Sequence, residues 1–164
     1  MLVAATNMND VVPIYLRTGR YAPRPSIRTV ANAMDVGAPS NLERIQWLYG
    51  DDLDALRKDV TGAAFADARV VAEIGNVARK HDYLLDPHGA IGWLGVEQAL
   101  MTADHTTPAV FLATAHPGKF REIVEPAIDR NIPLPKQLAD ALARPRYAIP
   151  MAADYDALRD FLRD

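Results

Sequence analysis

Cysteine is absent from this chain of 164 residues. Disulfide bonds, thiolate metal sites and cysteine nucleophiles are therefore excluded. The absence fits a reducing compartment without requiring one. Ser26 and Ser40 are the only serines, and neither lies in the strand–turn–helix setting of a nucleophilic serine.

Long apolar runs and a large charge of one sign are missing as well. No apolar run approaches the roughly 20 residues of a membrane helix, and the first residues lack the basic start and apolar stretch of a signal peptide. A charged fraction of 24% with a net charge of −3 offers no basic surface for nucleic acid or anionic membrane. These features predict a cytoplasmic protein, and 49% hydrophobic residues suffice for the core of one domain.

The sequence also lacks the spacing of a metal site. His81, His88, His105 and His116 form no i,i+4 pair and have no carboxylate at ligand spacing. The acidic residues 51–54 resemble half of a calcium loop, but the glycine and the terminal glutamate are missing. We therefore expect no metal ion and interpret the acidic run as a helix start.

The apolar pattern predicts an α/β protein. Two continuous apolar runs, Leu2–Ala5 and Ala109–Thr114, are typical of buried parallel strands. The proline-rich and glycine-rich residues 20–39 favour an extended segment at 26–36. Helical spacing or helix-start signals predict helices at residues 10–18, from 40 onward, within 51–62, and at 66–79, 86–100, 117–128, 136–143 and 155–162. Strands separated by helices indicate a small parallel sheet flanked by helices.

Three of the predicted helices begin with residues that commonly cap a helix. Asn9 can cap the first of them, and Asp86 can cap a helix in which Pro87 takes the first position. Ser40 and Glu43 have the spacing of a capping box. We expect the side chains of all three caps to accept backbone N–H groups.

Four polar residues are candidates for function on chemical grounds. Thr114 ends the second predicted strand, and ligands bind at the carboxyl ends of strands in open α/β sheets; a threonine that hydrogen-bonds the next turn is the alternative. His116 and Lys119 lie around a helix start, which favours an anion, although a capping histidine and a solvent-facing lysine would have the same pattern. His88 is an acid or base by type, or a structural histidine at its helix start.

Several motifs, in this order along the chain, resemble one enzyme family. They are Ala-Ala-Thr-Asn-Met-Asn-Asp-Val-Val-Pro (Ala4–Pro13), residues 23–43 with Asn-Ala-Met-Asp and Pro-Ser-Asn-Leu-Glu-Arg, residues 83–90 with Asp-Pro-His, and Ala-Thr-Ala-His-Pro-Gly-Lys-Phe (Ala113–Phe120). Together they resemble the C-terminal third of threonine synthase, a pyridoxal-phosphate (PLP) lyase of fold type II. That family converts O-phospho-L-homoserine and water into L-threonine and phosphate.

The resemblance assigns expected roles to three of the candidates. Thr114 would share a hydrogen bond with the pyridine nitrogen of PLP, because a serine or threonine stands there in enzymes of this fold type. His116 and Lys119 would bind the substrate. The resemblance thus implies PLP as the cofactor and O-phosphohomoserine as the small-molecule partner, and it places no catalytic residue within residues 1–164.

The resemblance also implies that the chain is incomplete as an enzyme. The family's Schiff-base lysine and Gly-Asn-Phe-Gly phosphate loop would precede Met1, and none of Lys58, Lys80, Lys119 and Lys136 has a matching setting. We therefore expect residues 1–164 to form a single C-terminal α/β portion. Its partial sheet would need an upstream region or chain, and alone it would be inactive. A non-catalytic interaction module and one half of a split enzyme are the alternatives.

Overall fold

The computed structural model describes residues 1–50, 52–102 and 107–163, so Asp51 and His105 lie outside the described residues. Contacts divide the chain into two compact units, Met1–Ile132 and Pro133–Asp164. The grouping of residues 1–164 into one C-terminal portion stays a prediction.

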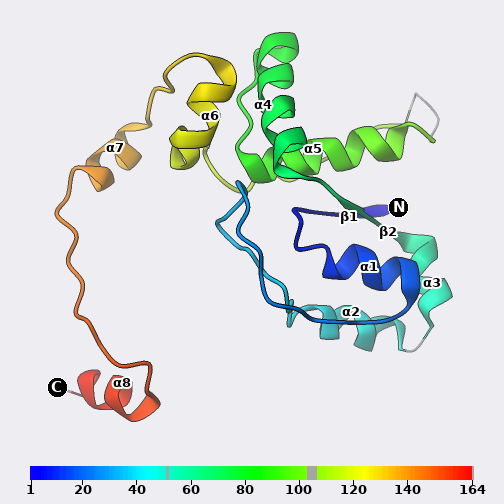
Figure 1. The fold of residues 1–164 in the computed structure, drawn as a ribbon, viewed down its shortest axis with the longest axis horizontal. Coiled ribbons are helices and arrows are strands. Elements are labelled where there is room, and N and C mark those ends of the chain that lie inside the picture. The colour runs from blue at the N-terminus through cyan, green and yellow to red at the C-terminus, as the bar shows by residue number, and fades with distance from the viewer. Residues whose placement is uncertain (51, 103–106, 164) are drawn as a thin grey trace. The chain divides into compact units, whose positions relative to one another are not determined.

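The first unit contains two strands, with helices between them and after them (Figure 1). Its elements, in chain order, are β1 (Leu2–Thr6), α1 (Val11–Thr18), α2 (Leu42–Tyr49), α3 (Leu53–Asp59), β2 (Val60–Ala64), α4 (Asp67–His81), α5 (Pro87–Leu100), the 3₁₀ helix η1 (Pro117–Phe120) and α6 (Arg121–Ile128). The helices predicted at 66–79 and 86–100 are confirmed, and so is the end of the first helix at Thr18-Gly19.

A parallel pair of strands forms the sheet. β1 and β2 run side by side in register from Leu2 opposite Val60 to Thr6 opposite Ala64. Helix α1 packs on β2 and helix α5 on β1, so the strands lie between these two helices (Figure 1). The α/β class with a small parallel sheet is confirmed.

The second strand of this pair differs from the prediction. β2 lies at Val60–Ala64, where the spacing predicted that a helix continues to Gly62. Ala109–Thr114 is not a strand in the structure, and Val110 and Leu112 are 85% and 78% exposed. A strand exists only where a neighbour supplies hydrogen bonds, and the described residues offer this segment none. The prediction of a buried strand there is wrong for this chain.

Two of the three predicted helix caps are wrong. α1 and α2 begin without a side-chain cap, and Asp10 and Asn41 occupy their N-cap positions. The Asn9 side chain is used elsewhere. Asp86 does cap α5, because its carboxylate accepts the backbone N–H groups of His88 and Gly89. At Asn9, the distant loop residues Ile27 and Asp35 take up the hydrogen bonds of the side chain.

The core of the first unit lies where α4, α5 and α6 meet (Figure 1). It depends on close approach, as at Gly95 of α5, where an added Cβ would lie 2.8 Å from Cβ of Ala5 in β1. The buried cluster consists of Ala31, Val70, Ile74, Val77, Leu85, Ala90, Ile91, Leu94, Phe120, Val124 and Ile132.

The side chain of Glu125 stabilises the turn that follows α6 through hydrogen bonds. Its Oε1 accepts hydrogen bonds from Arg121 Nε at 2.7 Å and from the backbone N of Ile132 at 2.9 Å. The hydrogen bond from Arg121, then that from Ile132, lowers the pKa of Glu125 below its ordinary value of 4.5. The folded chain therefore holds its Glu125 proton less tightly than the unfolded chain does.

We expect Glu125→Gln to lower the free energy of unfolding at pH 7. A lowered pKa stabilises the fold above pH 4.5, and this contribution is lost as the pH falls through the folded pKa. The difference from the unsubstituted chain should therefore shrink towards about pH 3. Urea unfolding at both pH values measures it. Glu122→Gln on the same helix is the control, and an equal loss for both variants would contradict the role of Glu125.

The second unit carries two short helices, α7 (Lys136–Leu142) and α8 (Tyr155–Phe161), as predicted. Asp154 caps α8 by accepting the backbone N–H of Ala157. Neither helix contains a buried residue. In the described part of the chain, no helix is long and apolar enough to cross a membrane.

Candidate functional site

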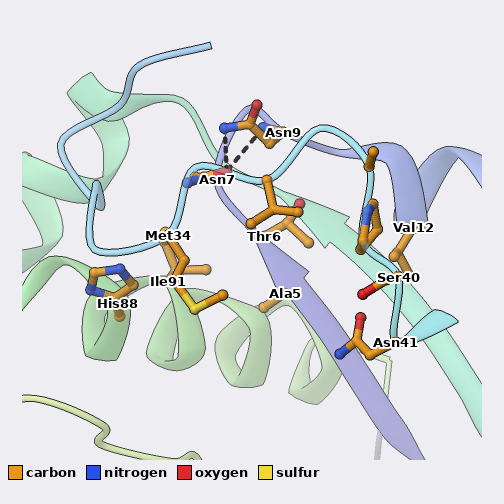
Figure 2. A pocket seen from close by; sticks show the side chains of 13 residues that line it. Ala5, Thr6, Asn7, Asn9, Val12, Met34, Ser40, Asn41, His88 and Ile91 are labelled. Atoms are coloured by element: carbon orange, nitrogen blue, oxygen red, sulfur yellow. Dashed lines mark hydrogen bonds between the residues drawn. The ribbon is translucent and has the colours of Figure 1, made fainter. Parts of the chain in front are cut away.

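A pocket of about 650 Å³ lies at the carboxyl end of β1 (Figure 2). This is the end of a parallel strand at which ligands bind in open α/β sheets, and the volume suits a small organic molecule. The end of β1, the loop before α2 and the first turns of α5 form its walls. The lining residues are Ala5, Thr6, Asn7, Asn9, Val12, Met34, Val36, Ala38, Pro39, Ser40, Asn41, His88 and Ile91.

One carboxylate, Asp35, holds the loop wall of the pocket in place. Its Oδ1 accepts hydrogen bonds from Asn7 Nδ2 at 3.0 Å, Asn9 Nδ2 at 3.2 Å and Thr29 Oγ1 at 2.8 Å. Its Oδ2 accepts the backbone N–H of Thr29 at 3.1 Å. Asn7, Asn9 and Thr29 are all buried. Buried polar groups need such partners, so Asp35 fixes the loop against the end of β1.

The side-chain amide of Asn9 pairs with the backbone of the same loop, as the peptide group of a neighbouring strand would. Its Oδ1 accepts the backbone N–H of Ile27, and its Nδ2 donates to the carbonyl of Ile27, both at 2.9 Å. The side chains of Asn9 and Asn7 are also hydrogen-bonded to each other (Figure 2). Residues 26–36, predicted as an extended segment, bend and turn at 30–33 in the structure, and side chains hold them without strand pairing among the described residues.

A glycine lets this loop cross itself. The carbonyl of Gly37 accepts the backbone N–H of Arg24, and the backbone N–H of Gly37 donates to Ser26 Oγ. A Cβ at position 37 would lie only 2.0 Å from the carbonyl oxygen of Arg24. The segment 38–41, which lines the pocket, continues directly from this crossing.

Asp86 and His88 form a dyad on the α5 side of the pocket. The Asp86 side chain is 1% exposed, and its Oδ2 lies 3.0 Å from His88 Nδ1. The same oxygen accepts the backbone N–H of His88, while Oδ1 accepts that of Gly89 at 3.1 Å. The cap thus orients an imidazole that lines the pocket. Sequence reasoning assigned the cap but missed this second use of the carboxylate.

The predicted ligand residues lie on a turn next to this dyad. The ring of Phe120, at the end of η1, lies 5.2 Å from that of His88. Thr114 is exposed in an irregular segment, and Lys119 is exposed on η1. His116 caps η1, because its Nδ1 accepts the backbone N–H of Gly118 at 3.0 Å. None of Thr114, His116 and Lys119 lines the pocket, so their binding roles stay predictions.

Sequence reasoning missed the loop network altogether. Asn7 and Asp35 are 28 residues apart, and Thr29 lies between them in a stretch without helical or strand periodicity. The only hint was local: an Asn-Met-Asn sequence directly after an apolar strand. No pattern within a short stretch of sequence could connect this Asn-Met-Asn sequence to Asp35.

Comparison with known proteins agrees with this architecture. The family profile "Threonine synthase, C-terminal" matches residues 89–162. The crystal structure of threonine synthase from Escherichia coli matches with a TM-score of 0.85 at 32% identity, covering 98% of this chain and 36% of that one. This chain is related to the C-terminal region of the threonine synthases. The predicted resemblance is confirmed.

Further threonine synthases match over the same length. That of Serratia marcescens is 36% identical over 166 residues, which cover 98% of this chain and 36% of that protein. The X-ray crystal structure of PLP-bound threonine synthase from Brucella melitensis matches with a TM-score of 0.83 at 30% identity, covering 99% of this chain and 40% of that one. The chain thus spans little more than a third of the length of these threonine synthases.

Proposed function

We propose that this chain forms the C-terminal side of the active site of a cytoplasmic, PLP-dependent threonine synthase. The reaction would convert O-phospho-L-homoserine and water into L-threonine and phosphate. The observation that carries the proposal is the match to threonine synthases over 98% of the chain, with the pocket at the carboxyl end of β1. A likeness of fold alone would not assign an activity, so the residues of the pocket must also suit the cofactor and the substrate.

The pocket fits one side of a cofactor site. Its walls are mostly apolar, with a few polar side chains such as Thr6, Ser40 and Asn41, which is the composition of small-molecule sites. His88 Nε2 is buried without a partner among the described residues, so the site leaves a polar atom for a ligand. PLP, when bound, supplies the electron sink for such chemistry.

The turn at residues 114–119 would serve the cofactor ring and the substrate. The exposed hydroxyl of Thr114 is available to hydrogen-bond the pyridine nitrogen, as the family resemblance implies. His116 Nδ1 already accepts a backbone N–H, so the neutral ring carries its proton on Nε2 and can donate it to an anion. Lys119, exposed on the same 3₁₀ helix, would add a positive charge for the substrate phosphate.

The lysine that reacts with the cofactor would come from outside residues 1–164. All four lysines of the chain are exposed, and none lines the pocket. The exposed apolar side chains of Val110 and Leu112 suit a segment that becomes a sheet strand when further strands lie beside it. On this proposal the isolated chain makes no threonine.

A chimeric enzyme tests the proposal. This chain would replace the matching region of the Escherichia coli threonine synthase, and threonine formation from O-phosphohomoserine would be measured with and without PLP. PLP-dependent activity is the expected result. A folded chimera that binds PLP and forms no threonine would argue against the proposed activity.

In the same chimera, Thr114→Val should lower turnover by about two- to tenfold, the equivalent of one hydrogen bond. Its effect on stability should be small, because Thr114 is exposed. Steady-state kinetics and thermal unfolding measure the two effects. Thr107→Val, at another exposed threonine of the same irregular segment, is the matched control. Equal turnover in all three proteins would remove Thr114 from the site.

A further inference from the structure

The pocket contains a single side chain that can carry charge. Of its thirteen lining residues, all within the described part of the chain, His88 alone is titratable. The lining includes no carboxylate and neither lysine nor arginine. Its other polar groups include the hydroxyl of Ser40 and the amide of Asn41 (Figure 2). His88 is therefore the lining side chain that can oppose a charge on the ligand with a charge of its own.

Asp86 fixes which ring nitrogen of His88 is free. The Asp86 carboxylate accepts two backbone N–H groups at the start of α5. An ionised carboxylate 3.0 Å from Nδ1 requires a proton on that nitrogen. Nε2 is left to interact with something else, and the Phe120 ring at 5.2 Å limits movement of the imidazole.

The other ring nitrogen of His88 lacks a partner in the described part of the chain. His88 Nε2 is buried, and no group in the described residues hydrogen-bonds it. Buried polar atoms without a partner are rare in folded proteins and call for an explanation. Since the residue lines the pocket, a ligand there is the natural partner.

We propose that His88, oriented by Asp86, is a ligand-binding residue that, with both ring nitrogens protonated, donates through Nε2 to an anionic oxygen of a phosphorylated amino acid in the pocket. An anion is favoured because the lining holds no carboxylate to repel it. Because Nδ1 donates to Asp86, Nε2 can donate only when the ring carries a second proton, so the ring would take up that proton together with the anion. Asp86 acts through His88 and is a positioning residue. The inference rests on the proposed function for the identity of the ligand.

Nuclear magnetic resonance of the full 164-residue chain, labelled with ¹⁵N-histidine, tests the inference. O-phospho-L-homoserine is the first probe. Inorganic phosphate and L-homoserine then separate binding through the phosphate from binding through the carboxylate. The expected result is a saturable shift of His88 Nε2 with O-phosphohomoserine and with one of the two part-ligands. The exposed His81, at the end of α4, is the internal control and should not move.

Two substitutions complete the test. His88→Gln and Asp86→Asn should each weaken binding of O-phosphohomoserine by about fivefold or more, while His81→Gln should leave it unchanged. If Asp86→Asn does not fold, His88→Gln and the spectra of the unsubstituted chain decide. An unmoved His88 signal, a proton on Nε2 in place of Nδ1 in the neutral ring, or full affinity in His88→Gln would overturn the inference.

The outcomes separate this inference from the proposed function. A shift at His116 with none at His88 would reject the His88 site while supporting the proposed phosphate contact on the 114–119 turn. A shift at His88 together with an inactive chimera would retain the anion site and reject threonine synthesis as its purpose.

Discussion

Ile74→Ala is expected to lower the free energy of unfolding by about 2–5 kcal/mol, the range for removing a large aliphatic side chain from a packed core. Ile74 is completely buried, and it belongs to the cluster at which α4, α5 and α6 meet. The cavity would remain because neighbouring side chains from several helices cannot all relax into it. Urea unfolding followed by circular dichroism measures the change.

The matched control is Val110→Ala. The sequence pattern predicted both positions to be core, yet Val110 is 85% exposed. Its substitution should change the free energy of unfolding by less than about 0.5 kcal/mol. Comparable losses at the two positions would mean that residues 109–114 are packed in solution, contrary to the structure. In the chimeric enzyme, where we propose that this segment joins a larger sheet, Val110→Ala should lower the free energy of unfolding by more than it does in the isolated chain.

Asp35→Ala should destabilise the chain by about 2–4 kcal/mol, because it deprives buried donors of a charged acceptor. The donors are the side-chain amides of Asn7 and Asn9 and the backbone N–H and hydroxyl of Thr29. Asp35→Asn keeps one acceptor oxygen but turns the other into a donor. We therefore expect Asp35→Asn to lower the free energy of unfolding by about half as much as Asp35→Ala does. Thermal and urea unfolding measure both variants.

Loss of Asp35 should also weaken ligand binding in the pocket, since residues 34–41 form one of its walls. Asp54→Asn is the control, because its ion pair with Arg57 is exposed and contributes little. A variant of Asp35 with unchanged stability would show that water can replace the network. A variant with lower stability and unchanged ligand affinity would show that the loop wall is not part of the site.

Local chemistry in the sequence was enough for much of the fold. α4 follows from the apolar stripe through Val70, Ile74 and Val77, and α5 follows from the Asp86-Pro87 start. β1 follows from a short apolar run that ends in polar residues. In each case the residues that form the element also carry its signal, so a short window contains the information.

Predictions from short stretches of sequence were wrong where a residue far along the chain decides which structure forms. β2 exists because β1, about 58 residues earlier, pairs with a stretch of small residues that has no strand signal of its own. Ala109–Thr114 has a strong strand pattern, but the described residues place no strand beside it. Asn9 matched a helix cap, but Ile27 and Asp35 supply its hydrogen bonds.

By itself, the sequence determined the α/β class, most helix positions and, through its motifs, the relation to threonine synthases. Only the tertiary structure decided that Asp35 ties a loop to the end of β1, and that Asp86 turns His88 into a pocket residue with a free nitrogen. The physical reason is separation along the chain. Helices and caps depend on neighbours within a few residues, whereas a pocket depends on side chains brought together from residues 5 to 91.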